Sequence, residues 1–163
     1  SYQPLVHPAT VTTDRESGGC VLQTRPTSCG AAAAAILLRQ HGIPATESEM
    51  VALCRTWTSG TPLHGIIRGL RIRTSGTSWR VECGELAAPA LIRVRLSPEV
   101  ALRDPRYESN WGWTRGQEHV VVFLGFDDQG ARIADPSAGL EHWSRETFRD
   151  LRQGGSITLS KRP

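Results

Sequence analysis

The chain divides into a first half with a helical spacing of apolar residues and a second half with the spacing of β-strands. The strongest helix is predicted after Ser28, a residue type favoured at helix N-caps, and runs through an alanine-rich stretch until Gly42 ends it. Thr46 opens a Thr-Glu-Ser-Glu capping box that predicts a second helix. A third helix is predicted to begin with Pro62 at its first position.

The second half is predicted to form an antiparallel sheet. The expected strands cover residues 79–83, 90–96, 119–126, 131–135 and 156–159, and a short helix capped by Ser144 precedes the last of them. Residues 127–130 form the hairpin turn between the third and fourth strands. Residues 97–117, with two prolines and an aromatic cluster, are predicted to be a long loop. Helices followed by such a sheet predict an α+β fold.

The length of 163 residues and a hydrophobic content of 39% suit one globular domain. Residues 1–19 are polar and end in Ser-Gly-Gly, which predicts an irregular N-terminal arm, so the single domain is expected over residues 20–163.

Charge and hydropathy exclude two classes of partner. The net charge is only +3 and the arginines are scattered, which argues against a nucleic-acid-binding protein. The longest apolar run, residues 30–38, is too short to span a bilayer. Because the chain begins without methionine, we expect a processed bacterial protein, with membrane association through a removed N-terminal segment or an extracytoplasmic location. A cytoplasmic location is the alternative, and the oligomeric state stays open.

The four cysteines contain no CxxC pair, which excludes a zinc ribbon or a thioredoxin-like motif. If Cys29 is catalytic, Cys54–Cys83 is the disulfide to test, and the alternative is that Cys20, Cys54 and Cys83 are buried free thiols. The histidines lack metal-ligand spacing, so no metal and no cofactor are predicted.

Cys29 is the strongest candidate for a nucleophile. It falls where the alanine-rich helix begins, and the helix dipole and unpaired N–H groups at that position favour a thiolate. Gly30 beside it leaves room for the backbone of a substrate. Gln23, six residues before Cys29, is predicted to return through the turn at Pro26 and to direct its side-chain N–H at a developing oxyanion.

His119 and Asp135 are the candidate partners of that thiol. His119 begins the most hydrophobic strand and Asp135 closes the next one, at similar distances from the hairpin tip. A histidine and an aspartate at the open ends of one hairpin can form a hydrogen bond, and in a triad the acid fixes the histidine tautomer and stabilises the imidazolium.

Each of these residues also has a purely structural interpretation. Cys29 and His119 are of types that are often buried for packing or structure, Asp135 before Pro136 is typical of a turn, and Gln23 fits an ordinary loop. Their joint spacing favours the catalytic interpretation. Two tryptophans of the polar loop, Trp111 and Trp113, are predicted to be partly exposed substrate-binding residues of the cleft, with a place in the core as the alternative.

The combination resembles the peptidase C39 family, papain-like cysteine peptidases found fused to bacteriocin-exporting ABC transporters. That family's pattern of Gln, Cys, His and Asp-Pro matches Gln23, Cys29, His119 and Asp135-Pro136, with both characteristic spacings, six and sixteen residues, preserved. The resemblance covers residues 20–159. It implies a papain-like fold, an oxyanion hole that includes Gln23, and cleavage of a leader or precursor peptide after Gly-Gly.

There are departures from the family pattern. Ser28 stands where members often have Asp, and the loop at residues 97–117 is longer than in transporter-linked members and is expected to form a wall of the cleft. The function predicted from the sequence is therefore hydrolysis of peptide bonds through a thioester on Cys29. The alternatives are an acyl or amide transferase with the same triad, and a non-catalytic module that binds a peptide.

Overall fold

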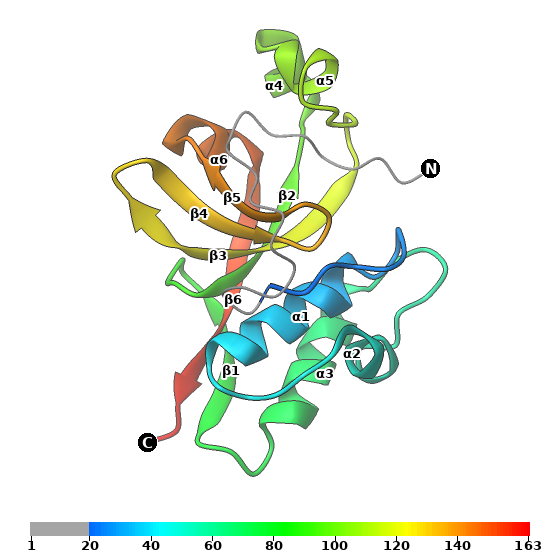
Figure 1. Cartoon of the computed structure of the whole chain (residues 1–163), viewed down its shortest axis with the longest axis vertical. Helices are drawn as coiled ribbons and strands as arrows, with labels where there is room; N and C mark the ends of the chain where they lie inside the picture. Colours follow the sequence, from blue (N-terminus) through cyan, green and yellow to red (C-terminus); the bar gives the residue numbers. More distant parts are fainter. Residues whose placement is uncertain (1–19) are drawn as a thin grey trace.

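The structure, a computed structural model, describes residues 20–163 (Figure 1). The predicted arm at residues 1–19 lies outside the described residues. Statements below refer to the described part of the chain.

Three helices follow one another at the start of the described chain, as the sequence predicted. They are α1 (Cys29–Gln40), α2 (Glu47–Leu53) and α3 (Leu63–Thr74). The hydroxyl of Thr46 accepts a hydrogen bond from the backbone N–H of Glu49 at 3.1 Å, so the predicted cap of α2 is present. Ser28 occupies the N-cap position of α1, but its hydroxyl makes no cap bond; it donates to Glu47 and accepts from the backbone N–H of Arg25.

Six antiparallel strands form one sheet in the order β1-β6-β2-β3-β4-β5. The strands are β1 (Trp79–Gly84), β2 (Ala90–Arg95), β3 (Glu118–Asp127), β4 (Gly130–Asp135), β5 (Gly139–Trp143) and β6 (Arg152–Lys161). The sequence prediction missed β5 and made β6 too short. The predicted helix capped by Ser144 is α6 (Arg145–Leu151), whose cap bond from Thr147 N measures 3.0 Å.

The expectation of a long irregular loop over residues 97–117 is wrong. This segment contains two short helices, α4 (Pro98–Arg103) and α5 (Arg106–Ser109). The Ser97 hydroxyl accepts from Val100 N and begins α4, and the Tyr107 side chain is 2% exposed. The apolar residues of this polar-looking segment therefore anchor it to the protein body.

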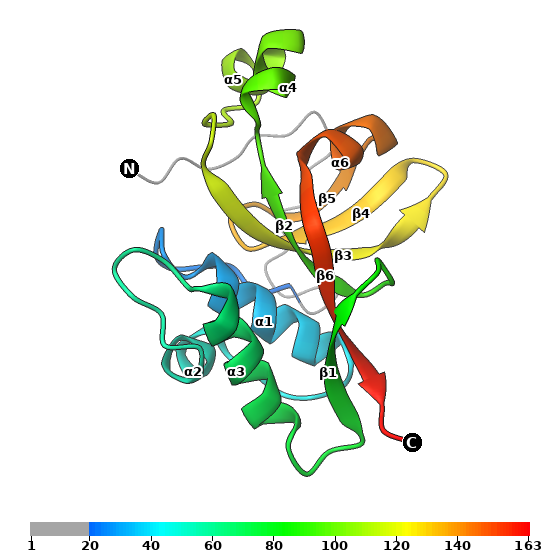
Figure 2. The ribbon, with the colours of Figure 1, turned by 180° about the vertical axis from the view of Figure 1, so that it is seen from behind.

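The sheet separates two hydrophobic cores. Helices α1 and α3 cover one face, and α2 packs against these two helices. The alanine-rich α1 lies directly against β3, where its small side chains permit close approach (Figure 1). On the other face, α6 lies beside the strands, and the α4–α5 segment at the end of β2 contributes side chains to the same core (Figure 2). Three helices come first along the chain and the antiparallel sheet follows them, which is the α+β arrangement that the sequence predicted.

A one-residue bulge in the β3–β4 hairpin sets the faces on which the two strands present their side chains. The register shifts between Phe123 and Gly125, where Gly125 adopts a φ of +128°. On the side of the bulge that is away from the hairpin turn, Val122 pairs with Ala134. His119 and Asp135 therefore point from the same face, because side chains on a strand alternate with a period of two.

The Cys54–Cys83 disulfide that the sequence singled out for testing is absent. All four cysteines are free, and Cys54 is buried while Cys83 is exposed on β1. The alternative of three buried thiols holds for Cys20 and Cys54 only. Across residues 20–163 the structure contains no helix with the length and hydropathy of a membrane span.

Candidate active site

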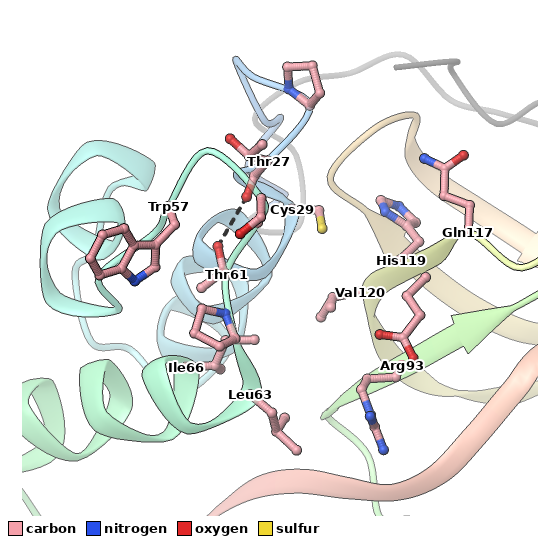
Figure 3. A pocket seen from close by; sticks show the side chains of 15 residues that line it. Thr27, Cys29, Trp57, Thr61, Leu63, Ile66, Arg93, Gln117, His119 and Val120 are labelled. Carbon is pink, nitrogen blue, oxygen red and sulfur yellow. Dashed lines mark hydrogen bonds between the residues drawn. The ribbon is translucent and has the colours of Figure 1, made fainter. Parts of the chain in front are cut away.

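Cys29 is the first residue of α1, and its side chain is partly exposed at the N-terminal end of that helix. Its thiol and the His119 ring face each other across a cleft (Figure 3). The imidazole forms a hydrogen bond with the Cys29 thiol. The structure thus brings together the predicted nucleophile and the predicted base.

His119 and Asp135 form a buried pair. His119 Nε2 lies 2.6 Å from Asp135 Oδ1, and the two residues are 7% and 0% exposed. Because Asp135 occupies Nε2, the ring presents Nδ1 to Cys29. This arrangement fixes both the tautomer and the orientation of the ring.

The charge of Asp135 determines the protonation of His119. Burial alone lowers the pKa of the imidazole, but the negative charge of Asp135 and its hydrogen bond, together with the contact to Cys29, raise that pKa to about 10. A ring with this pKa binds a proton strongly, so it can take the proton of a neighbouring thiol and keep it.

Two further side chains contact Asp135. Ser137 donates to Asp135 Oδ1 through its backbone N–H at 2.8 Å and its hydroxyl at 2.7 Å. Glu141 on β5 is 2% exposed, and its carboxyl group lies close to that of Asp135 and to the Trp143 indole. Burial and the charge of Asp135 raise the pKa of Glu141 well above its ordinary value, so it is protonated at neutral pH. Asp135 therefore both starts a turn and orients His119.

The turn before Cys29 is held by a carboxylate from α2. Glu47 Oε1 accepts from the Ser28 hydroxyl at 2.7 Å and from the Thr24 hydroxyl at 2.9 Å, and the Thr24 backbone N–H also donates to it at 3.0 Å. Ser28 is completely buried. The residue that departs from the family pattern thus connects the start of α1 to α2.

The cleft has a volume of about 610 Å³ and two walls of different character. Its helical wall is mainly apolar and its strand wall carries charge (Figure 3). The Thr61 hydroxyl donates to the Thr27 carbonyl at 3.2 Å, which joins the two loops of the helical wall. The lining side chains include Thr27, Trp57, Thr61, Leu63 and Ile66 on the helical wall and Arg93, Gln117, Glu118, His119 and Val120 on the strand wall.

Gly30 has a different role from the predicted one. It is buried inside the helical wall, where an added Cβ would lie 2.8 Å from Ile66 Cδ1 and 2.9 Å from Thr61 Cβ. The missing side chain therefore makes room for Ile66 and Thr61 rather than for a substrate. Its effect on the cleft is indirect, through the position of these two residues.

Gln23 lies near the pair but is engaged elsewhere. Its backbone N–H donates to the Pro136 carbonyl at 2.8 Å, which ties the segment before Cys29 to the loop after Asp135. Its side-chain Nε2 donates to the Arg25 carbonyl at 2.8 Å. One of the two amide N–H groups is thus used within the turn.

The expectation that Trp111 and Trp113 line the cleft is not met. Trp113 is 3% exposed in the second core, with its ring edge-on to Trp143, and Trp111 packs against the same core and against Tyr107. From the segment at residues 97–117 only Gln117 reaches the cleft. The prediction that this segment forms a wall is therefore wrong, because its apolar residues are needed in the core.

Several residues of the site were missed by sequence reasoning. Ser137 carried a usable signal, because a serine two residues after an aspartate is typical of an Asx-turn. Glu141 carried none, since it lies on the unpredicted strand β5. Trp57 at 66% exposure and Arg93 entered no motif. Within residues 20–163 no three His, Cys, Asp or Glu side chains come together as a metal site.

Comparison with known proteins supports the family resemblance seen in the sequence. Residues 18–163 match the sequence model of the peptidase C39 family. An uncharacterised protein of Methanothermobacter thermautotrophicus is 27% identical over 146 residues, which cover 86% of this chain and 87% of that protein.

Two solved structures share the fold. The peptidase domain of Streptococcus ComA, a bi-functional ABC transporter involved in a quorum sensing pathway, has a TM-score of 0.66 at 19% identity, with 88% of this chain and 98% of that domain covered. A double glycine motif protease from an AMS/PCAT transporter, in complex with its leader peptide, has a TM-score of 0.67 at 16% identity, with coverage of 97% and 98%. The predicted papain-like fold is confirmed.

Proposed function

Because the chain belongs to the peptidase C39 family, we propose that it is a cysteine peptidase in which Cys29, His119 and Asp135 form a catalytic triad. The observation that carries this proposal is the contact between the Cys29 thiol and a His119 ring whose Nε2 is held 2.6 Å from Asp135 Oδ1. A nucleophile, a base and an orienting acid in this order are what covalent peptide hydrolysis requires.

The reaction proceeds in two halves. His119 Nδ1 takes the proton of the Cys29 thiol, and the thiolate attacks the carbonyl carbon of the scissile peptide. The C–N bond then breaks, the leaving amine takes the proton from His119, and a thioester remains on Cys29. Water gives a proton to His119, attacks the thioester and releases the acid, and the proton returns to the thiol.

The oxyanion of each tetrahedral intermediate is stabilised at the start of α1. The first N–H groups of a helix have no partner inside the helix, so the backbone N–H of Cys29 is available to donate to the oxyanion. Gln23 contributes through the amide N–H that Arg25 does not use. Replacement of Gln23 therefore lowers the rate less than replacement of Cys29.

The proposed substrate is a leader or precursor peptide cut after small residues such as Gly-Gly. This is supported by the neighbour structure that is a double glycine motif protease bound to a leader peptide. Transfer of the acyl group to an amine is the competing outcome, since the same thioester forms in both reactions.

The test is digestion of a peptide library that includes Gly-Gly sequences, with wild type, Cys29→Ala and Cys83→Ser compared by mass spectrometry. Cys83 is exposed and lines the hollow beside the cleft rather than the part around Cys29, and serine is close to it in size, so Cys83→Ser controls for loss of a thiol. We expect cleavage by wild type and Cys83→Ser and none by Cys29→Ala. Cleavage that survives in Cys29→Ala contradicts the proposal, and aminated product in the presence of an added amine identifies a transferase.

A further inference from the structure

The catalytic cleft continues into a second hollow. Leu63 and Arg93 line both the cleft that contains Cys29 and a neighbouring hollow of about 220 Å³. The second hollow has an apolar floor made by Leu91 on β2 and Ile157 on β6. A chain bound at Cys29 can therefore extend past Arg93 to this floor.

A bulge in β6 directs Arg93 into this groove. Ile92 pairs with Ser156 but Arg93 pairs with Gln153, so Gly154 and Gly155 are extra residues between the two pairs. Gly154 has a φ of +63°, and an added Cβ there would lie 3.3 Å from Arg93 Nη2. Bulges change the direction of nearby side chains, and this one leaves space for the guanidinium over the backbone of Gly154.

The guanidinium of Arg93 has N–H donors available for a ligand. Within residues 20–163 it forms no ion pair and no side-chain hydrogen bond, whereas Arg73 and Arg103 each bind a carboxylate. Glu118 lines the same cleft without forming an ion pair with Arg93. A half-buried guanidinium with five N–H donors recognises a planar carboxylate better than any other common group of a peptide.

We propose that Arg93 is an anion subsite that selects peptides with an aspartate or glutamate side chain, followed or preceded by an apolar residue that occupies the second hollow. The proposal rests on the proposed function only in that the cleft holds a peptide. It adds the chemistry of the substrate at one position away from the scissile bond.

The experiment measures peptide binding by fluorescence anisotropy in a Cys29→Ala background. The probes are C-terminally amidated ten-residue peptides with a central Gly-Gly pair, in which Glu, Gln or Lys is moved through the other positions. At one position we expect the Glu peptide to bind at least about fivefold more tightly than the Gln peptide, as for a partly exposed charge-assisted pair. A preference seen only when the terminal amide is replaced by a free carboxylate would assign Arg93 to a chain terminus and overturn the proposal.

Charge reversal gives the decisive comparison. In Arg93→Glu the preferred residue at the same position changes from Glu to Lys, and in Arg93→Gln the preference is lost. Arg71→Glu is the matched control, because Arg71 is an exposed arginine in the last turn of α3 and does not line the groove. Glu118→Gln removes the other charge of the strand wall and increases the preference for Glu.

Absence of a charge preference at every position, or a preference that Arg93→Glu leaves unchanged, overturns the subsite. These results are independent of cleavage, because binding is measured without the nucleophile. If wild type prefers Glu but cleaves no peptide, the proposed peptidase function is contradicted and the Arg93 subsite is supported. If it cleaves peptides without a charge preference, the peptidase function is supported and the subsite is contradicted.

Discussion

The carboxyl group of Glu141 lies beside that of Asp135, so the acid of the proposed triad has a second, protonated acid as its neighbour. Ile133 pairs with Glu141 and Asp135 pairs with Gly139, which places the two acids on the same face of β4 and β5. Both are buried, at 2% and 0% exposure. One negative charge, rather than two, is therefore held next to His119.

This relationship predicts that Glu141→Gln stabilises the protein at neutral pH. Glu141 is protonated in the folded state but ionises above its ordinary pKa of 4.5 when unfolded, so the folded state binds one more proton. The stability of wild type should then fall by about 1.4 kcal/mol for each pH unit above that value, until the raised pKa is reached. Glutamine keeps an N–H donor for Asp135 and carries no proton to lose. Urea unfolding from pH 4 to pH 8 should give wild type and Glu141→Gln the same free energy of unfolding at pH 4. As the pH rises, the variant should become increasingly more stable than wild type.

Glu141→Leu separates charge from hydrogen bonding. It is also neutral, but it leaves Asp135 with one donor fewer, which costs roughly 1–3 kcal/mol for a buried group. At pH 4 we expect Glu141→Leu to be less stable than both wild type and Glu141→Gln. Equal stability of the two variants would show that Asp135 does not need the donor.

A second prediction concerns the proton on His119. Asp135→Asn removes the negative charge that raises the pKa of the ring to about 10, while the burial that lowers it remains. The ring should then lose its proton at a lower pH than in wild type, which NMR titration of the histidine rings can follow with His119→Gln for assignment. Asp127→Asn is the control, because Asp127 pairs with His142 at 2.8 Å outside the cleft. A His119 titration that is the same in Asp135→Asn and wild type would contradict the role of Asp135.

The sequence was sufficient for the order of most elements and for the expectation that Cys29, His119 and Asp135 lie close together. It was not sufficient for the bulge near Gly125. Counting back from the tip of the hairpin gives similar positions for His119 and Asp135. Near the turn, however, Gly125 pairs with Arg132, and if this register continued to the ends of the strands, the two side chains would lie on opposite faces of the sheet. The bulge corrects this, and its place follows from the pairing of β3 with β4, which the apolar run of β3 does not specify.

The errors at Gly30 and Trp113 have a common physical cause. Both residue types are ambiguous in a sequence, since glycine permits close approach by substrate or by protein, and tryptophan suits a cleft or a core. Which partner is present depends on segments far away in the chain, Ile66 for Gly30 and Trp143 for Trp113. Local pattern alone does not contain this information.

Glu47 is predicted to stabilise the turn that carries the nucleophile. Glu47→Ala removes the acceptor of the buried Ser28 hydroxyl and of two Thr24 donors, so we expect a loss of roughly 1–3 kcal/mol and slower alkylation of Cys29 by iodoacetamide. Alkylation is best measured with the exposed Cys83 replaced by serine. Glu49→Ala is the matched control in the same first turn of α2, because its ion pair with Arg73 is partly exposed and should contribute less than about 1 kcal/mol. If Glu47→Ala and Glu49→Ala lose the same stability and the same alkylation rate, Glu47 acts only through the stability of α2 and not through the turn before Cys29.

Trp57 and Trp113 should respond to truncation in opposite ways. Trp57 is 66% exposed at the rim of the cleft, so Trp57→Ala should leave the free energy of unfolding within about 0.5 kcal/mol of wild type. Peptide binding to the cleft should weaken by roughly tenfold, since an aromatic side chain there covers apolar surface of a bound chain. Trp113→Ala should instead cost about 3–5 kcal/mol, because it opens a cavity beside Trp143. Urea unfolding and peptide anisotropy on both variants test the pair. Weakened binding with unchanged stability in Trp113→Ala would return this residue to the cleft, where its sequence context had placed it.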